Sequence, residues 1–177
     1  MKSSKTVSIL GVNGFIGHHL LRRILDTTNW RVIGLDIYDD RIEKDKKNKR
    51  FEFHKADIFK DGALIESLVK KSDVVLPLAG IANPQIYITD HLKVFELDFE
   101  ANLPIVRHCV KYCKRVIWPS TSEVYGMSPD KEFHPDISSL VLGPINKVRW
   151  IYSSSKQLMD RIIWSYGKDR GLDFTLF

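Results

Sequence analysis

The chain has 177 residues, of which 44% are hydrophobic, and it carries a formal net charge of +5. This length and apolar fraction allow a buried core of ordinary size and suit one globular domain. No apolar run reaches membrane-spanning length, and the first residues lack the apolar core of a signal peptide. We therefore expect a cytoplasmic protein without membrane insertion.

Much of the positive charge lies in one run, residues 44–50, which reads Lys-Asp-Lys-Lys-Asn-Lys-Arg. Such runs most often form solvated loops, and we expect a loop here. Phosphate steering or weak nucleic-acid contact are the alternatives. Because no aromatic stacking platform or recognition motif accompanies the charges, no nucleic-acid partner is predicted.

The two cysteines, Cys109 and Cys113, lie four residues apart in a helical pattern. This spacing within an apolar segment favours a packing role over metal ligation or a disulfide. Neither His108 nor the pair His18 and His19 supplies the second half of a metal site. No metal site is therefore predicted.

Short apolar runs alternate with amphipathic segments, which is the pattern of strand-helix-strand units in a parallel sheet. Strands are expected at residues 6–10, 31–36, 51–56, 73–78, 115–119 and 172–177. Helices are expected after the first strand, after the third strand, over 94–113 with an interruption at Pro104, and over 153–167, with a loop at 127–149. No repeat or linker divides the chain, so we predict one doubly wound α/β domain, a Rossmann fold, over residues 1–177.

Three glycines follow the first strand with the spacing G-x-x-G-x-x-G, at Gly11, Gly14 and Gly17. A backbone without side chains can approach a pyrophosphate, and the start of the next helix offers it unpaired N–H groups. The same triplet could be only a tight strand-to-helix turn. Asp36 ends the second strand, where a carboxylate accepts hydrogen bonds from ribose hydroxyls and repels a 2'-phosphate. Unless Asp36 is merely a helix cap or a loop charge, the pattern predicts NAD rather than NADP.

Further candidate contacts lie at the carboxyl ends of the next two strands, where ligands of open parallel sheets bind. Asp57 and Ile58 follow the third strand and could contact the adenine, although Asp57 could equally cap a helix. Residues 79–82 are small or apolar, and they could run beside the nicotinamide ribose or serve close packing. The predicted cofactor contacts are Gly11, Asn13, Gly14, Phe15, Ile16, Gly17, Asp36, Asp57, Ile58 and Ala79.

A tyrosine and a lysine four residues apart, Tyr152 and Lys156, share one face of the last expected helix. The ammonium can stabilise a phenolate, and the phenolate can take a proton from a substrate hydroxyl, as hydride transfer to a nicotinamide requires. Thr121, Ser122 and Glu123 follow the fifth strand and complete a candidate active site split over two elements. Plainer readings stay open for all five residues. Tyr152 and Lys156 could be an ordinary helical pair. Thr121 and Ser122 could cap a turn, and Glu123 could be a surface carboxylate.

Together these motifs resemble the extended short-chain dehydrogenase/reductase family, which includes nucleotide-sugar epimerases, dehydratases and decarboxylases. Longer strings are similar to the UDP-glucuronic acid decarboxylase domains of bifunctional polymyxin-resistance proteins. These strings lie at residues 94–100, 119–127, 143–147 and 149–153. The resemblance runs from about Lys5 to Phe177. It implies NAD-dependent oxidation and decarboxylation of UDP-glucuronate on the route to 4-amino-4-deoxy-L-arabinose, a lipid A modification.

The resemblance also implies roles for individual residues. Tyr152 and Lys156 would drive oxidation at the sugar 4-position, and Glu123 would serve in acid/base chemistry. The implied catalytic residues are Ser122, Glu123, Tyr152 and Lys156. The implied substrate contacts are Ala82, Tyr87, Thr121 and Ser122, of which Tyr87 lies in an otherwise featureless loop.

In the family, the strand that ends at Phe177 continues into an Arg-Pro segment and a substrate-binding portion with an arginine used in decarboxylation. The 177-residue sequence lacks that portion, so it is expected to be either part of an enzyme or a shorter protein. Two function classes therefore stay open: the NAD-binding half of a UDP-glucuronate decarboxylase, and a non-catalytic NAD-binding or oligomerisation module. Another nucleotide-sugar epimerase or dehydratase is a third reading. Apolar residues on a second face of helices 94–113 and 153–167 favour a homo-oligomer, as in the family.

Overall fold

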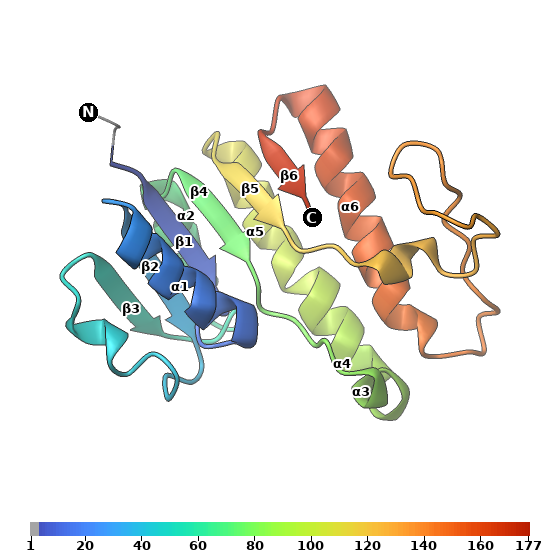
Figure 1. Ribbon diagram of the computed structural model, residues 1–177, viewed down its shortest axis with the longest axis horizontal. Helices are drawn as coiled ribbons and strands as arrows, with labels where there is room; N and C mark the ends of the chain where they lie inside the picture. The colour runs from blue at the N-terminus through green and yellow to red at the C-terminus, as the bar shows by residue number, and fades with distance from the viewer. Residues whose placement is uncertain (1–3) are drawn as a thin grey trace.

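A six-stranded parallel sheet with the strand order β3-β2-β1-β4-β5-β6 forms the centre of the computed structural model, which describes residues 4–177 (Figure 1). The strands are β1 (Thr6–Leu10), β2 (Arg31–Asp36), β3 (Phe51–Lys55), β4 (Val74–Pro77), β5 (Arg115–Trp118) and β6 (Phe174–Leu176). The strand order reverses between β1 and β4, as in doubly wound nucleotide-binding folds. The predicted fold class is confirmed, and residues 1–3 of the predicted domain lie outside the described residues.

Helices connect the strands and cover the two faces of the sheet (Figure 1). They are α1 (Phe15–Thr27), α2 (Gly62–Lys71), α3 (Pro84–Thr89), α4 (His91–Phe95), α5 (Asn102–Lys111) and α6 (Trp150–Arg170). Three short turns are η1 (Asp45–Lys47), the π-helical η2 (Glu96–Glu100) and η3 (Ser122–Tyr125). Two core clusters involve the sheet: one joins it to α1, and the other joins it to α2, α5 and α6.

Alternation along the strands separates these two clusters. Successive side chains of a strand point to opposite faces of the sheet. Val7 and Ile9 therefore pack in the cluster of α1, whereas Leu10 packs in the cluster of α2, α5 and α6. Burial of such side chains on both faces supplies the main stabilisation of a parallel sheet.

The helix expected over 94–113 is interrupted, but not at Pro104. The break is η2, where the Ala101 N–H donates to the Glu96 carbonyl five residues earlier, at 2.8 Å. Pro104 lies in the first turn of α5, where a backbone N–H has no partner within the helix. The prediction of a break was right and its cause was wrong, because a proline so near a helix start needs no interruption.

Tyr87 lies in α3 and not in a featureless loop, which corrects the sequence interpretation. Asn83 caps this short helix, since its side chain accepts the Gln85 N–H at 3.0 Å. Pro84 occupies the first turn, where its fixed backbone angle suits a helix start. These two signals could have predicted α3 from the sequence.

The basic run 44–50 is also more than a solvated loop. Lys46 forms ion pairs with Asp39 and Glu43. Arg50 donates to backbone carbonyls around the end of α1, including that of Thr28 at 2.6 Å. Part of the run therefore joins the segment between β2 and β3 to α1.

The cysteines lie in different environments. Cys109 is fully buried in the core, and burial raises the pKa of its thiol to about 12. Cys113 is exposed and has a φ of 53° just after α5. Both are free thiols, so the predicted packing role is confirmed for Cys109.

The described residues 4–177 contain neither a membrane-spanning helix nor a metal-binding cluster of acidic, histidine or cysteine side chains. None of the helices there is both long enough and apolar enough to cross a membrane. Within the same residues, no group of three or more His, Cys, Asp or Glu side chains is placed to hold a metal ion.

Candidate active site

The glycine turn between β1 and α1 fits closely against its neighbours. Gly11 has a φ of +96°, and a Cβ there would lie 2.6 Å from the backbone nitrogen of Ala79. A Cβ at Gly17 would lie 2.3 Å from the Gly11 carbonyl oxygen. Gly14 has more room, because its Cβ would lie 3.2 Å from that oxygen. Gly11 and Gly17 are thus required by the turn itself, whereas Gly14 leaves the exposed surface above the turn open.

Asp36 holds the end of β2 against this turn. Its carboxylate accepts the Asn13 N–H at 2.9 Å and the Tyr38 N–H at 3.2 Å. The Asn13 side chain in turn donates to Asp40 at 2.8 Å and accepts the Arg41 N–H at 2.9 Å. A carboxylate has about four acceptor sites, so Asp36 can still accept from a ligand.

A cavity of about 430 Å³ opens beside the glycine turn, where β1, β2, β3 and β4 end. Its volume is typical of a small-molecule site. Among the predicted cofactor residues, it brings together Gly11, Gly14, Asp36, Asp57, Ile58 and Ala79. Asn13, Phe15, Ile16 and Gly17 do not line it; Phe15 and Ile16 are exposed at the start of α1.

Several residues of this cavity were not predicted. They are Leu35, Ile37, Tyr38, Ala56, Phe59, Leu78, Lys93 and Leu97, whereas Gly80 belongs to the expected segment 79–82. Most of them lie within two residues of a predicted contact. Tyr38 and Phe59, whose rings are largely exposed, could therefore have been predicted from the ends of the second and third strands. Lys93 comes from α4, and its place at the cavity could not be read from local sequence.

Asp57 is not the cap of the helix that follows it. The N-cap of α2 is Asp61, and Asp57 instead accepts the Phe59 N–H at 2.9 Å within its own turn. The Asp57 N–H donates to the Asp61 carboxylate at 2.7 Å. The helix-cap alternative is therefore wrong, and Asp57 keeps its place on the cavity wall.

The tyrosine and lysine of α6 are both buried, with 7% and 6% of their surface exposed. The Lys156 ammonium donates to the Pro119 carbonyl at 3.0 Å and lies 4.4 Å from the centre of the Trp118 ring. It lies 5.9 Å from the centre of the Tyr152 ring, on the shared helix face that the spacing predicted. Burial lowers the pKa of Lys156, and the carboxylates of Asp98 and Asp160 oppose that shift.

Asp98 is the charged partner that the sequence analysis missed. It lies in η2 with 1% of its surface exposed, and its Oδ1 is 3.6 Å from Lys156 Nζ. Burial raises the pKa of Asp98 to about 6, although the lysine charge opposes this. A signal existed, because Asp98 interrupts the apolar series of Val94, Ala101 and Ile105 on one helix face.

Tyr87 stacks directly on Tyr152, with ring centres 4.4 Å apart and ring planes 10° apart. Burial raises the pKa of Tyr87. Burial and the charge of Asp98 raise the pKa of Tyr152, while hydroxyls of Tyr87 and Thr121 lower it in part. Burial and the Asp98 charge therefore favour the neutral phenol, so a Tyr152 phenolate would depend on support from the Lys156 ammonium.

The predicted segment after β5 forms η3, beside the tyrosine. Thr121 caps this turn by accepting the Glu123 N–H at 3.2 Å, and its contact with the sugar stays a prediction. Glu123 is more than a surface carboxylate, since it accepts from Arg149 at 2.9 Å and from Ser153 at 3.4 Å. Ser122 is exposed.

Short-chain dehydrogenases and reductases join a nucleotide-binding parallel sheet to a tyrosine and a lysine one helical turn apart, and this chain has both. Residues 7–177 match the NAD dependent epimerase/dehydratase family, and the chain belongs to that family. The match confirms the family resemblance found in the sequence. It also confirms NAD as the predicted cofactor.

Solved structures agree with this assignment. The chain is 59% identical to the PbgP3 protein from Burkholderia pseudomallei, with a TM-score of 0.95 over 99% of this chain and 52% of that one. UDP-glucuronic acid 4-epimerase from Bacillus cereus, in complex with UDP-glucuronic acid and NAD, is 23% identical. Its TM-score is 0.80 over 97% of this chain and 55% of that one. UDP-N-acetylglucosamine 4-epimerase from Methanobrevibacter ruminantium is 22% identical, with a TM-score of 0.82 over 98% of this chain and 54% of that one. The two epimerases show the shared fold alone, and the chain spans about half the length of all three proteins.

Proposed function

We propose that residues 1–177 form the NAD-binding portion of a UDP-glucuronic acid decarboxylase. One observation carries the proposal: the cavity and the tyrosine–lysine pair lie on two sides of the loop 79–81. Gly80 lines the cavity, while the Ile81 N–H donates to Asp98, which contacts Lys156. A cofactor in the cavity would thus lie next to a base. The similarity to decarboxylase domains over 94–100 and 119–127 supports UDP-glucuronate as the proposed substrate.

The chain's own residues fit NAD. The exposed backbone at Gly14 and the free N–H groups at the start of α1 suit the pyrophosphate. Asp36 is placed to accept hydrogen bonds from the hydroxyls of the adenosine ribose. Asp57 and Ile58 would contact the adenine, and Ala79 would lie beside the nicotinamide ribose. When bound, NAD supplies the acceptor for the hydride that leaves the sugar.

The proposed chemistry begins at the 4-hydroxyl of UDP-glucuronate. Tyr152 takes the hydroxyl proton as hydride leaves C4, and the Lys156 ammonium stabilises the phenolate that this requires. The new ketone is beta to the carboxylate, so carbon dioxide leaves as the C–C bonding electrons form an enolate. Ser122 donates to the enolate oxygen, and Glu123 carries the proton that completes the UDP-4-keto-pentose.

The remaining assignments concern the substrate and the pathway. Ala82, Tyr87 and Thr121 are proposed to contact the nucleotide sugar, and the product enters the lipid A 4-amino-4-deoxy-L-arabinose route. Ala82 is exposed just before α3, whereas Tyr87 is buried and stacks on Tyr152.

Calorimetry with NAD tests the cofactor site. NAD is expected to bind the wild-type chain, and Gly14→Val is expected to weaken binding at least about tenfold by covering the pyrophosphate position. Gly62→Val is the matched control, because a Cβ there meets nothing within 4 Å. Folded wild-type protein that shows no NAD binding would refute the proposal.

Incubation with UDP-glucuronate and NAD tests the reaction. Turnover is expected to be very slow or absent, because the chain spans about half the length of the proteins it matches. Any NADH and carbon dioxide that form are expected in equal amounts, and Tyr152→Phe is expected to abolish both. NADH without carbon dioxide would favour another nucleotide-sugar enzyme of the family. NAD binding without any turnover would favour the non-catalytic binding module.

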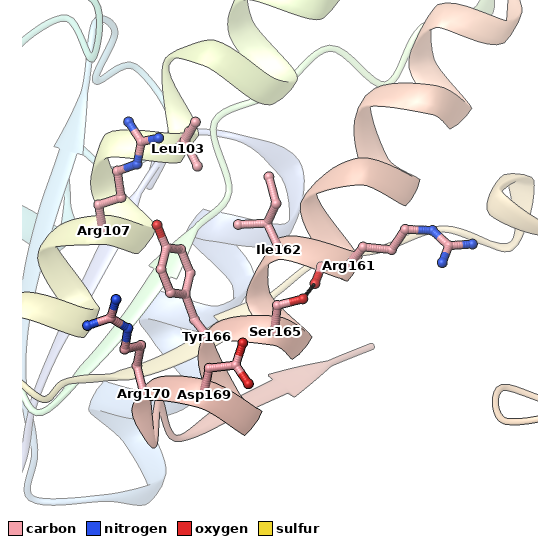
Figure 2. A pocket seen from close by; sticks show the side chains of 8 residues that line it. All are labelled: Leu103, Arg107, Arg161, Ile162, Ser165, Tyr166, Asp169 and Arg170. Atoms are coloured by element: carbon pink, nitrogen blue, oxygen red, sulfur yellow. Dashed lines mark hydrogen bonds between the residues drawn. The ribbon is translucent and has the colours of Figure 1, made fainter.

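We also propose that the chain pairs with a second copy through α5 and α6. A hollow of about 460 Å³ lies between these helices, with Leu103 and Arg107 on α5 and Tyr166 on α6 (Figure 2). Asp169 lies among the arginines of this surface, so two copies can pair charges of opposite sign. Light scattering is expected to give twice the 20.5 kDa chain mass, and Ile162→Asp is expected to return it to one chain. An unchanged mass in that variant would exclude this surface.

A further inference from the structure

The loop 79–81 beneath the cofactor cavity is held by two buried side chains from the other side. Asp98 Oδ2 accepts the Ile81 N–H at 3.0 Å. Asn102 Nδ2 donates to the Ala79 carbonyl at 3.0 Å. A Cβ at Gly80 would lie 2.5 Å from Asp98 Oδ1, so a glycine is needed for this close approach.

Both side chains belong to the irregular part of the helix. Asp98 lies within η2, and Asn102 begins α5 two residues after the end of η2. A π-helical turn changes the angular position of the side chains around it, and such turns recur at functional sites. Asp98 and Asn102 have 1% and 0% of their surface exposed, so the turn directs both into the protein.

The same carboxylate also lies beside the base cluster, which consists of Lys156, Tyr152 and Tyr87. Asp98 Oδ1 lies 3.6 Å from Lys156 Nζ, and the phenols of Tyr152 and Tyr87 are the other titratable groups whose pKa values its charge raises. Asp160 also acts on Lys156, but its carboxylate is bound by Ser120 Oγ at 2.5 Å. Of these two acidic residues, Asp98 is the one that reaches the cavity loop.

We propose that Asp98 is a positioning residue that keeps Lys156 charged and ties it to the loop under the cofactor cavity, so that dinucleotide binding and the charge of the base are coupled. A buried ammonium is stable only when paired, so loss of the carboxylate favours the neutral amine. A neutral Lys156 gives no electrostatic support to a Tyr152 phenolate. The identity of the dinucleotide rests on the proposed function; the contacts of Asp98 do not.

Three variants separate the two roles of Asp98. Asp98→Asn keeps an acceptor for the Ile81 N–H but removes the charge, whereas Asp98→Leu removes both. Asp90→Asn is the matched control, because Asp90 is exposed and forms no ion pair among the described residues 4–177. NMR of isotope-labelled lysine, with the Lys156 signal assigned from Lys156→Met, follows the titration of its ammonium.

Asp98→Asn is expected to lower the Lys156 titration midpoint by at least about one pH unit and to leave NAD affinity within about threefold. Asp98→Leu is expected to lower the midpoint and also to weaken NAD about tenfold. Saturating NAD is expected to shift the midpoint in the wild type and to shift it less in Asp98→Leu, because coupling between sites is reciprocal. Asp90→Asn is expected to change none of these values.

Two results would overturn the proposal: an unchanged Lys156 midpoint in folded Asp98→Asn, or wild-type NAD affinity in folded Asp98→Leu. If Asp98→Leu does not fold, Gly80→Ala replaces it, since its methyl group pushes the loop away from the carboxylate without removing the charge. A wild-type chain that binds no NAD would refute the proposed function and the coupling. The Lys156 midpoint would then still decide whether Asp98 sets the lysine charge.

Discussion

The two halves of the candidate site are held by different kinds of interaction. In the cofactor half, backbone groups pack closely at Gly11 and Gly17, and Asp36 accepts two backbone N–H groups at a partly exposed position. In the base half, the charges of Asp98 and Lys156 are buried beside two stacked tyrosines. Substitutions should therefore act through shape in the first half and through unpaired charge in the second.

The largest effect is expected from Lys156→Met, which leaves the Asp98 carboxylate buried without its ionic partner. Breaking a buried ion pair from one side costs about 3–5 kcal/mol of unfolding free energy. Urea denaturation at pH 7 measures the loss, and Lys168→Met on the exposed end of α6 should cost less than about 1 kcal/mol. Equal losses in both variants would remove the distinction between the two halves.

The next effect concerns pH. The folded pKa of Asp98 is raised from 3.8 to about 6, so between these values the folded protein binds more protons than the unfolded chain. This contribution to stability is complete below pH 3.8 and is lost as the pH rises through 6. From pH 4 to 7, the unfolding free energy of the wild type should fall relative to Asp98→Asn by up to about 3 kcal/mol. Parallel curves in denaturation series at several pH values would contradict a buried, titrating Asp98.

In the cofactor half, the contrast is between two glycines of one turn. Gly17→Ala places a methyl group against backbone atoms and should cost about 1–3 kcal/mol in unfolding free energy. Gly14→Ala has ordinary φ and ψ angles and more room, so its cost should stay below about 1 kcal/mol. Thermal and urea unfolding compare the two variants. A larger loss for Gly14→Ala would mean that steric fit does not govern this turn.

Of the four main predictions, Arg50→Ala is expected to have the smallest effect. The variant loses hydrogen bonds to the carbonyls of Leu25, Thr28 and Trp30, and should cost about 1–2 kcal/mol because water can partly replace a donor at this half-buried position. Lys49→Ala is the neighbouring exposed control and should be neutral within about 0.5 kcal/mol. Equal values would show that the run 44–50 is only a solvated loop after all.

The sequence predicted features that depend on local periodicity. Short apolar runs between amphipathic segments located all six strands, and the glycine spacing located the turn before α1. The four-residue spacing of Tyr152 and Lys156 placed them on one helix face for the same reason. Each of these features is encoded within a short stretch of chain.

The missed features depend on contacts between distant segments. Asp98 meets Ile81 and Lys156, which lie far from it in sequence, and η2 has no local signal comparable to a glycine turn. The stacking of Tyr87 on Tyr152 likewise requires α3 and α6 to be in place. Local sequence could name Tyr152 and Lys156 as candidates for a base, but only the assembled fold shows which groups lie against them.

The unlike environments of the two cysteines provide a built-in reporter of local opening. The exposed Cys113 thiol should react at once with an alkylating reagent at neutral pH. The buried Cys109 thiol, with its pKa raised to about 12, should react only when α5 separates from the sheet. Because η2 joins α5 to the base cluster, the rate of the second alkylation measures how often this layer opens, and a bound dinucleotide that holds the loop 79–81 should slow it.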